Sequence, residues 1–400
     1  MFNDTRSSNL LKNNICENSN FSNQLFPPFF TLMIILPYSF YLYLSINLKV
    51  YTDISTEVSF VIIDTNLGHN KNIINVGVMQ INRAKGNLLT PSQFTLTLKA
   101  IMVGMATMSL PNLVMRVSKQ DGWISIILGA VYPIYLVIVA NFMCKKSPKD
   151  NILVLSKKCF GNFLGGILNF IFISFFLFDL TAELSGYSNI FRVYAVTFLK
   201  NYQVLLTVLI PISFVSYKGI KTLGRLNEVG FYLTVCLIIF PVGILAYGSI
   251  LNLMPIFGSG LNNIVKGSSQ TVFAYSGMEI IFLIYPFLQS RKKLLKCGLV
   301  STAIVAFIYV WVTFGTIYYL GVESSQKYIW PVITLSDSIK IPVINSFRYI
   351  FVTLWSLVEF KCISTFYFAI SYGLNQSIKK ISAKTFTILG GCVVMGQKRQ

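Results

Sequence analysis

Four acidic residues lie within long apolar stretches of this 400-residue chain: Asp179, Glu183, Glu279 and Glu359. A carboxylate inside a membrane costs free energy unless it is paired or wetted, so each is a candidate functional group by default. Asp179 and Glu183 are four residues apart and share one helix face, which favours a wetted cavity or a shared proton. The alternative is that both lie near the outer end of their helix and touch the lipid headgroups.

Glu279 ends an Ala-Tyr-Ser-Gly-Met-Glu sequence and lies one turn past the point where its glycine interrupts the helix. At that position its carboxylate is suited to neutralise a cation or to hold an amino group. The alternative is a structural hydrogen bond to a neighbouring helix.

Two lysines also lie in apolar stretches. Lys99 is one turn into its helix and near the expected inner end, which favours snorkelling of its ammonium group to the interface. Lys361 follows Glu359 by two residues, a spacing that places the two side chains on different helix faces, so no intrahelical pair is expected. A buried lysine can alternatively serve as an internal counter-charge in place of sodium.

Motifs of soluble enzymes are missing from the sequence. The seven cysteines include no C-x-x-C pair, so neither a zinc site nor a disulfide framework is indicated, and the single histidine, His69, cannot build a metal cage. The G-x-S-x-G, P-loop and dinucleotide-binding motifs are also absent. We therefore expect no enzyme activity, no metal and no cofactor.

The elements that must position these groups are membrane helices. The chain is 54% hydrophobic and 12% charged, against about 45–50% and about 25% in soluble domains. A membrane span needs about 20 mostly apolar residues. The segments that meet this requirement, or come near it, lie near residues 25–47, 94–116, 122–144, 161–186, 203–217, 229–249, 269–289, 297–321 and 346–372.

The net charge is +19, and the basic residues that cause it are distributed as expected for a protein with several membrane spans. If 94–116 is the first core helix and leaves the cytoplasm, lysine and arginine are about twice as frequent in the inside loops as in the outside loops. This bias predicts eight alternating core helices in an all-α polytopic membrane protein. A nucleic-acid-binding patch would not alternate loop by loop, so no nucleic-acid partner is expected.

Two of these helices carry breaks. Segment 94–116 contains Gly104 and Pro111, and segment 269–289, five helices later, contains Gly277 with Pro286 beyond it. Glycine and proline weaken a membrane helix and free backbone groups that need partners. They are also common where helices pack closely. Interrupted helices at corresponding positions of two halves favour a substrate site near the bilayer midplane.

The first 86 residues have a different character and are expected to form an atypical extension with one apolar segment, 25–47. This segment is either an extra span, an uncleaved anchor, or translated sequence upstream of a true start at Met79. The last interpretation is slightly favoured, because the organised pattern begins only after it. Residues 87–400 then form the membrane domain.

From about Asn87 onward the chain resembles the spore germination permeases, the integral-membrane B subunits of nutrient germinant receptors. The resemblance covers roughly three hundred residues in order. It rests on several short motifs: Leu89-Thr-Pro-Ser-Gln-Phe94, Ser109-Leu-Pro111, Gln120-Asp-Gly-Trp-Ile-Ser-Ile-Ile-Leu-Gly129, Thr222-Leu-Gly-Arg-Leu-Asn-Glu228, Asn263-Ile-Val-Lys-Gly267 and Ala274-Tyr-Ser-Gly-Met-Glu-Ile-Ile-Phe-Leu-Ile-Tyr-Pro286.

The resemblance implies the inverted-repeat fold of amino acid permeases, in which broken helices one and six hold the ligand and helices three and eight flank it. It further implies a receptor in the inner membrane of a spore that binds a small nutrient such as an amino acid and acts with an A subunit and a lipoprotein C subunit. Carried onto this chain, the implied ligand-binding residues are Gly104, Thr107, Ser109, Tyr275, Ser276, Gly277 and Glu279. Weaker candidates, for the pocket or a linked proton, are Asp179, Glu183 and Ser364.

The chain departs from the family pattern at its end. The family continues through helices nine and ten, whereas the last apolar segment here, Thr385 to Gly396, is too short to cross as a straight helix. We therefore expect a C-terminally incomplete core of eight full helices and a partial ninth. Three functions stay open: a receptor subunit, a proton-coupled amino acid transporter of the same fold, and a truncated copy without function.

Overall fold

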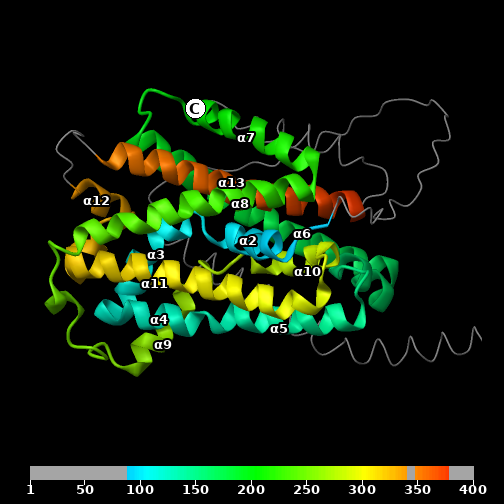
Figure 1. The fold of residues 1–400 in the computed structure, drawn as a ribbon, viewed down its shortest axis with the longest axis horizontal. Helices are drawn as coiled ribbons and strands as arrows, with labels where there is room; N and C mark the ends of the chain where they lie inside the picture. Colours follow the sequence, from blue (N-terminus) through cyan, green and yellow to red (C-terminus); the bar gives the residue numbers. More distant parts are fainter. Residues whose placement is uncertain (1–87, 340–346, 378–400) are drawn as a thin grey trace, which may run out of the picture.

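The computed structural model describes residues 88–339 and 347–377. Within these ranges the regular structure is helical, apart from an isolated bridge between Leu89 and Leu288 (Figure 1). The expectations for the extension 1–86, its apolar segment 25–47 and the partial ninth helix concern residues outside the described ranges.

The first core helix is broken at the predicted place. It consists of α2 (Pro91–Met102) and α3 (Ala106–Ser118), and residues 103–105 between them are not helical. Thr90 begins α2 with a capping box, because its hydroxyl accepts from the amide of Gln93 and the Gln93 side chain accepts from the amide of Thr90. Pro111 lies inside α3. The interruption is therefore centred on Gly104, and we name residues 103–105 the first break.

The second to fifth helices lie between the two broken ones. The second consists of α4 (Gly122–Gly129) and α5 (Val131–Lys146). It is followed by α6 (Ile152–Tyr194), α7 (Asn201–Lys218) and α8 (Ile220–Ile239). Helix α6 is kinked at Gly161, where φ is 76°, and Gly219 joins α7 to α8 with φ of 88°. Both angles lie in the left-handed region that glycine tolerates best.

The sixth helix is broken as well. Helix α9 (Leu261–Gln270) ends before a run of turns at 271–277, which we name the second break. The chain then continues as η5 (Met278–Ile280), α10 (Ile281–Ile284) and η6 (Tyr285–Phe287). The sequence indicated one apolar segment at 269–289, but the polar α9 lies before it. The sixth helix therefore starts earlier than its hydropathy shows.

The last described helices are α11 (Leu294–Gln326), α12 (Pro331–Asp337) and α13 (Phe347–Ser377). Helix α13 packs most extensively against α6 and also contacts α8, α7 and α2 (Figure 1). It therefore packs against both the broken first helix and the third helix.

Five helical runs among the described residues are long and apolar enough to cross a bilayer. They are Ala106–Lys146, Ile152–Tyr194, Ile220–Gly243, Arg291–Gln326 and Phe347–Ser377. Their outer faces expose large apolar side chains, such as Phe163, Phe170 and Tyr232, which favour contact with lipid over contact with water. The chain is an all-helical integral membrane protein, while the count and orientation of eight alternating spans stay predictions.

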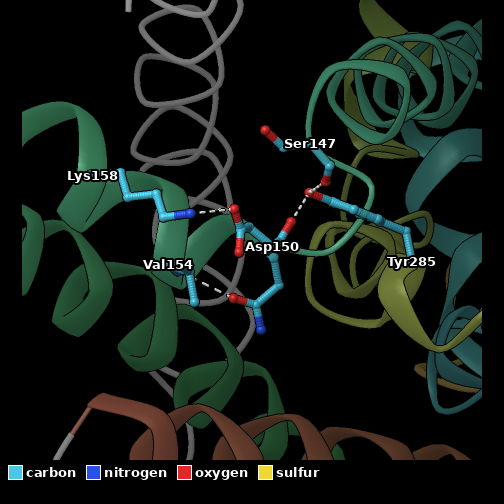
Figure 2. A network of polar contacts seen from close by, with 6 residues as sticks. Ser147, Asp150, Val154, Lys158 and Tyr285 are labelled. Atoms are coloured by element: carbon cyan, nitrogen blue, oxygen red, sulfur yellow. Dashed lines mark hydrogen bonds and ion pairs between the residues drawn. The ribbon is translucent and has the colours of Figure 1, made fainter. Parts of the chain in front are cut away.

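The loop between α5 and α6 is tied to the end of the sixth helix. Tyr285 donates hydrogen bonds from its hydroxyl to the backbone carbonyls of Ser147 and Asp150 (Figure 2). The Asp150 carboxylate pairs with the Lys158 ammonium at 2.5 Å, and the amide of Val154 donates to the Asn151 side chain that caps α6. These bonds fix the start of α6 relative to the second half of the sixth helix.

Candidate functional site

The first break exposes one amide that a distant carboxylate satisfies. The backbone N–H of Met105 donates to Oε2 of Glu183 on α6, at 2.9 Å. A Cβ atom placed on Gly104 would lie 2.7 Å from this oxygen, 2.7 Å from Cys362 Sγ and 3.1 Å from Glu359 Oε2. Glycine at position 104 therefore allows three polar groups to approach the backbone of the break.

The carbonyl groups at the end of α2 are also satisfied by side chains. The Lys361 ammonium donates to the carbonyls of Ala100 and Val103, at 3.4 and 3.2 Å. The last four carbonyls of any helix lack partners within that helix, and no water is present in a bilayer core to replace them. The lysine therefore supplies both hydrogen bonds and positive charge at the negative end of α2.

Two further side chains complete this end of α2. Cys362 donates from its thiol to the carbonyl of Ile101 at 3.1 Å, and Tyr309 on α11 donates from its hydroxyl to the carbonyl of Met102 at 2.5 Å. The Tyr309 hydroxyl also lies 2.7 Å from the carbonyl of Ala274 in the second break. One phenol group therefore bridges the two breaks and places them side by side.

The second break is held mainly by acidic residues. Gly277 has φ of 95°, in the left-handed region, and its amide donates to Oε2 of Glu279 at 2.8 Å. The other carboxylate oxygen of Glu279 accepts from the Tyr132 hydroxyl on α5. The Ser276 hydroxyl donates to Asp179 on α6 at 2.7 Å. Glu279 thus makes both a local bond within the break and a structural bond to a neighbouring helix.

Asp179 and Glu183 lie on adjacent turns of α6, and each accepts a hydrogen bond from a different break. Asp179 is 5% exposed and Glu183 is 8% exposed, so both carboxyl groups lie inside the protein. The alternative in which the two acids touch the lipid headgroups is wrong. Each acid therefore meets one of the two breaks.

Glu359 on α13 is the most isolated acid of the cluster. It is fully buried, and neither of its carboxylate oxygens has a hydrogen-bond partner among the residues that the structure describes. One carboxylate oxygen each from Glu183 and Glu359 and the Cys362 sulfur all lie within 4.8 Å of one another. Neither acid forms an ion pair within 4.0 Å in the described part of the chain.

Lys99 does not snorkel, contrary to the interpretation favoured from the sequence. Its side chain is fully buried, its ammonium donates to the Thr234 hydroxyl on α8 at 2.6 Å, and it lies 5.4 Å from the centre of the Phe231 ring. The prediction was wrong because α8 and α13 cover this side of α2, so the lysine has no path to the interface.

The ten candidate ligand residues divide into three groups. Six of them meet at the breaks through the contacts given above: Gly104, Ser276, Gly277, Glu279, Asp179 and Glu183. Thr107 lies in the first turn of α3, and its buried hydroxyl has no hydrogen-bond partner in the described ranges. Ser109 lies further along α3 and is half-buried.

The other two candidates point elsewhere. Tyr275 is buried, but its hydroxyl donates to the carbonyl of Ile126 on α4 at 3.1 Å. Ser364 donates to the carbonyl of Phe360 within its own helix at 2.7 Å. Both hydroxyls therefore have structural partners away from the breaks.

The structure adds Glu359, Lys361, Cys362 and Tyr309 to the cluster. The first two carried a signal in the sequence, because charged residues inside an apolar segment mark functional positions. Their spacing of two gave no reason to expect both at one break. Cys362 and Tyr309 carried no signal, since thiols and phenols are ordinary residues in membrane helices.

The fold and the paired breaks define a transporter-like membrane protein. A solved structure of similar fold is that of MhsT in complex with L-phenylalanine, with a TM-score of 0.54 and 16% sequence identity. The similarity covers 76% of this chain and 78% of that one. At this level of identity it establishes a shared fold, that of the LeuT-type transporters, and no shared ligand.

The family is established by sequence comparison. The model of the spore germination protein family matches residues 88–396, and the chain belongs to this family of transporter-like membrane proteins, which are not enzymes. Spore germination protein YndE of Bacillus subtilis (strain 168) is 26% identical over 297 residues, covering 73% of this chain and 82% of the relative. Spore germination protein GerQB of Bacillus cereus is 21% identical over 278 residues, covering 70% and 77%.

Proposed function

We propose that this protein is the membrane subunit of a nutrient germinant receptor, and that a small nutrient of the amino acid class binds between the two breaks. The observation that carries the proposal is the position of the Tyr309 hydroxyl, within hydrogen-bond distance of the Met102 carbonyl at the end of α2 and of the Ala274 carbonyl in the second break, because it brings the two interruptions to one place. Paired half-helix ends of this kind are the usual ligand sites of the fold.

The ligand residues of the proposal are those at the breaks and beside them, Gly104, Thr107, Ser109 and 275–277 together with Glu279. The amides of Met105 and Gly277 are occupied by carboxylates of the protein itself. A ligand carboxylate would exchange with one of these acids on the backbone amide. The ligand ammonium would then pair with the acid that it releases, so that a zwitterion enters without a net change of charge.

The proposed partners are an A subunit and a lipoprotein C subunit, and the proposed location is the inner membrane of the spore. Support comes from the family, whose members YndE and GerQB are named spore germination proteins. In a receptor of this kind, ligand binding shifts the relative positions of the broken helices, and the partner subunits respond to that shift.

A proton-coupled amino acid transporter of the same fold is the alternative. It is favoured by the buried acids Asp179, Glu183 and Glu279, since chains of intramembrane carboxyl groups are typical of proton relays. Uptake of radiolabelled amino acids into membrane vesicles separates the two functions. Saturable uptake that Glu279→Gln abolishes would support the transporter and contradict a receptor that only senses.

The receptor is tested by germination of a deletion strain complemented with this chain and its partner subunits. We expect the loss of spore refractility in response to a panel of L-amino acids to return. Gly104→Ala should raise the concentration needed for half-maximal response by about tenfold or more, equivalent to about 1.4 kcal/mol, because its methyl group meets Glu183 and Cys362.

The matched control is Gly166→Ala, since a methyl group there meets no atom within 4 Å. Immunoblots of spore membranes check that both variants are present in equal amounts. Wild-type protein that is present in the membrane but restores no response would contradict the proposal. An equal response from Gly104→Ala and Gly166→Ala would remove the first break from the ligand site.

A further inference from the structure

We infer that Glu183 and Glu359 bind one proton between them, and that this shared proton joins α6 to α13 beside the backbone of the first break. The inference concerns the protein without any nutrient, so it stands or falls independently of the proposed receptor function. It also changes the partner expected from the sequence, in which Asp179 was the acid that would share a proton with Glu183.

The contacts favour Glu359 over Asp179 as that partner. Asp179 is bonded to the Ser276 hydroxyl, while Glu183 turns to the amide of Met105. The carboxyl group beside Glu183 is that of Glu359, with oxygens of the two groups within 4.8 Å. Glu359 is fully buried and has no other hydrogen-bond partner in the described residues, so a proton on it has one acceptor nearby, the Glu183 carboxylate.

Charge balance sets the number of protons. Two ionised carboxylates this close in an apolar interior repel each other, and neither is paired with a cation within 4.0 Å among the described residues. Lys361 supplies one positive charge, but its ammonium is committed to the carbonyls of Ala100 and Val103. One proton on the pair leaves a single negative charge, which Lys361 balances through space.

Other ionisable groups surround this pair. Asp179 on α6 faces Glu183 and also Glu279 of the sixth helix, whereas Lys99 on α2 faces Lys361 and Cys362 rather than the acid pair. Tyr187 on α6 and Tyr309 on α11 are phenols and carry no charge at neutral pH. Cys362 on α13 holds its proton in the bond to the carbonyl of Ile101.

A proton fits this cluster better than a metal ion does. Two carboxylates and a thiol resemble a metal-binding set, but a metal requires the thiolate, and the Cys362 thiol is a hydrogen-bond donor here. A Cβ at Gly104 would already lie 2.7–3.1 Å from all three groups, so the cluster packs tightly against the helix backbone. A proton needs no additional space, whereas a hydrated cation does.

The shared proton makes the first break sensitive to its protonation state. With the proton, Glu359 donates to Glu183, Glu183 accepts from Met105, and α13, α6 and the first break are connected in one chain of bonds. When the proton leaves, an O–H bond on Glu359 is broken, the proton passes to water, and two negative charges face each other beside Gly104. We expect α6 and α13 to separate at this point.

Infrared spectroscopy of the purified full-length chain in lipid nanodiscs, without nutrient and with EDTA present, tests the inference directly. A protonated buried carboxyl group gives a carbonyl-stretch band that an ionised one lacks. We expect a band from the pair in the wild type, and we expect either Glu183→Gln or Glu359→Gln alone to remove it completely. In each variant the remaining acid ionises, because Lys361 then balances its charge alone.

Glu323→Gln is the matched control, since Glu323 is exposed, and it should leave the band unchanged. Survival of the band in Glu183→Gln would overturn the inference, because Glu359 would then hold a proton without a partner. Absence of the band from the wild type would also overturn it, as would a stoichiometric metal ion found by elemental analysis of protein purified without EDTA.

Thermal unfolding against pH is a second measurement that does not depend on assigning a band. The wild type should lose stability as pH rises and the pair loses its proton. Glu359→Gln keeps a neutral amide that can still donate to Glu183, so the loss that stems from the pair should disappear. Equal pH dependence in folded wild type and folded Glu359→Gln would contradict the inference.

Discussion

Both breaks leave backbone amides and carbonyls without partners in their own helix, and different groups satisfy them in each break. In the first break, the free carbonyls and the amide are satisfied by side chains from α13, α11 and α6, and the Lys361–Ala100 contact spans 261 positions of the sequence. In the second break, the amide of Gly277 is satisfied by Glu279, two residues away. The first break therefore depends on tertiary packing, whereas the second is partly held by its own segment.

This difference assigns distinct roles to the two breaks. Movement of α13 relative to α2 must disturb the bonds of Lys361 and Cys362, so the first break reports on helix positions. The second break is connected to α5 through the Tyr132–Glu279 bond and to α6 through the Ser276–Asp179 bond. A change in α6 reaches both breaks, because Asp179 and Glu183 lie on adjacent turns.

The largest expected effect is the loss of Lys361. Lys361→Met should lower the free energy of unfolding by about 3–5 kcal/mol, as removal of one buried charged partner does, because two carbonyls and a carboxyl pair lose their cation. Thermal unfolding in detergent measures it. Lys158→Met is the control, since its surface pair with Asp150 is worth about 0–1 kcal/mol. Equal effects would mean that the first break does not depend on the buried ammonium.

Tyr309→Phe tests the bond that joins the breaks. Two buried carbonyls, those of Met102 and Ala274, lose their donor, and we expect a loss of about 1–3 kcal/mol. Tyr318→Phe removes a hydroxyl that donates to the carbonyl of Leu245 from a half-buried position, and it should cost less. The role of the bridge would be refuted if the control were the more damaging change.

Gly277→Ala examines the local geometry of the second break. The left-handed φ of 95° costs an alanine about 1–2 kcal/mol, and its methyl group would also lie 2.9 Å from Ile101. Gly243→Ala has open space around the added methyl group and serves as the control. Both proteins are compared by thermal unfolding, where an unchanged midpoint for Gly277→Ala would show that the second break does not need glycine.

The smallest expected effect separates two serines. Ser276→Ala removes the donor to the buried Asp179 and should cost about 1 kcal/mol. Ser364→Ala removes a bond to a carbonyl of its own helix, which already has a helical partner, and should be nearly neutral. In the germination assay we expect only Ser276→Ala to weaken the response. A stronger effect of Ser364→Ala would instead support the prediction that Ser364 lines the ligand pocket.

Much of the architecture was predictable from the sequence because membrane spans must be long and apolar. The interruption at Gly104 was expected and is present in the structure, since glycine there lacks the side chain that would block approach of other groups. The start of the sixth helix was not predicted, because α9 is polar and hydropathy does not detect it. The prediction that Lys99 snorkels was wrong, because the depth of a residue in the membrane does not reveal which helices cover it.

The sequence by itself determined which charged groups enter the membrane and where the helices break, because both follow from residue type and local spacing. It did not determine which acid faces which partner. Glu183 lies opposite Glu359 rather than sharing a bond with Asp179, and Lys361 reaches the end of α2. Only the tertiary structure decides these pairs, because they depend on the rotation and depth of α6 and α13 against a helix far away in the chain.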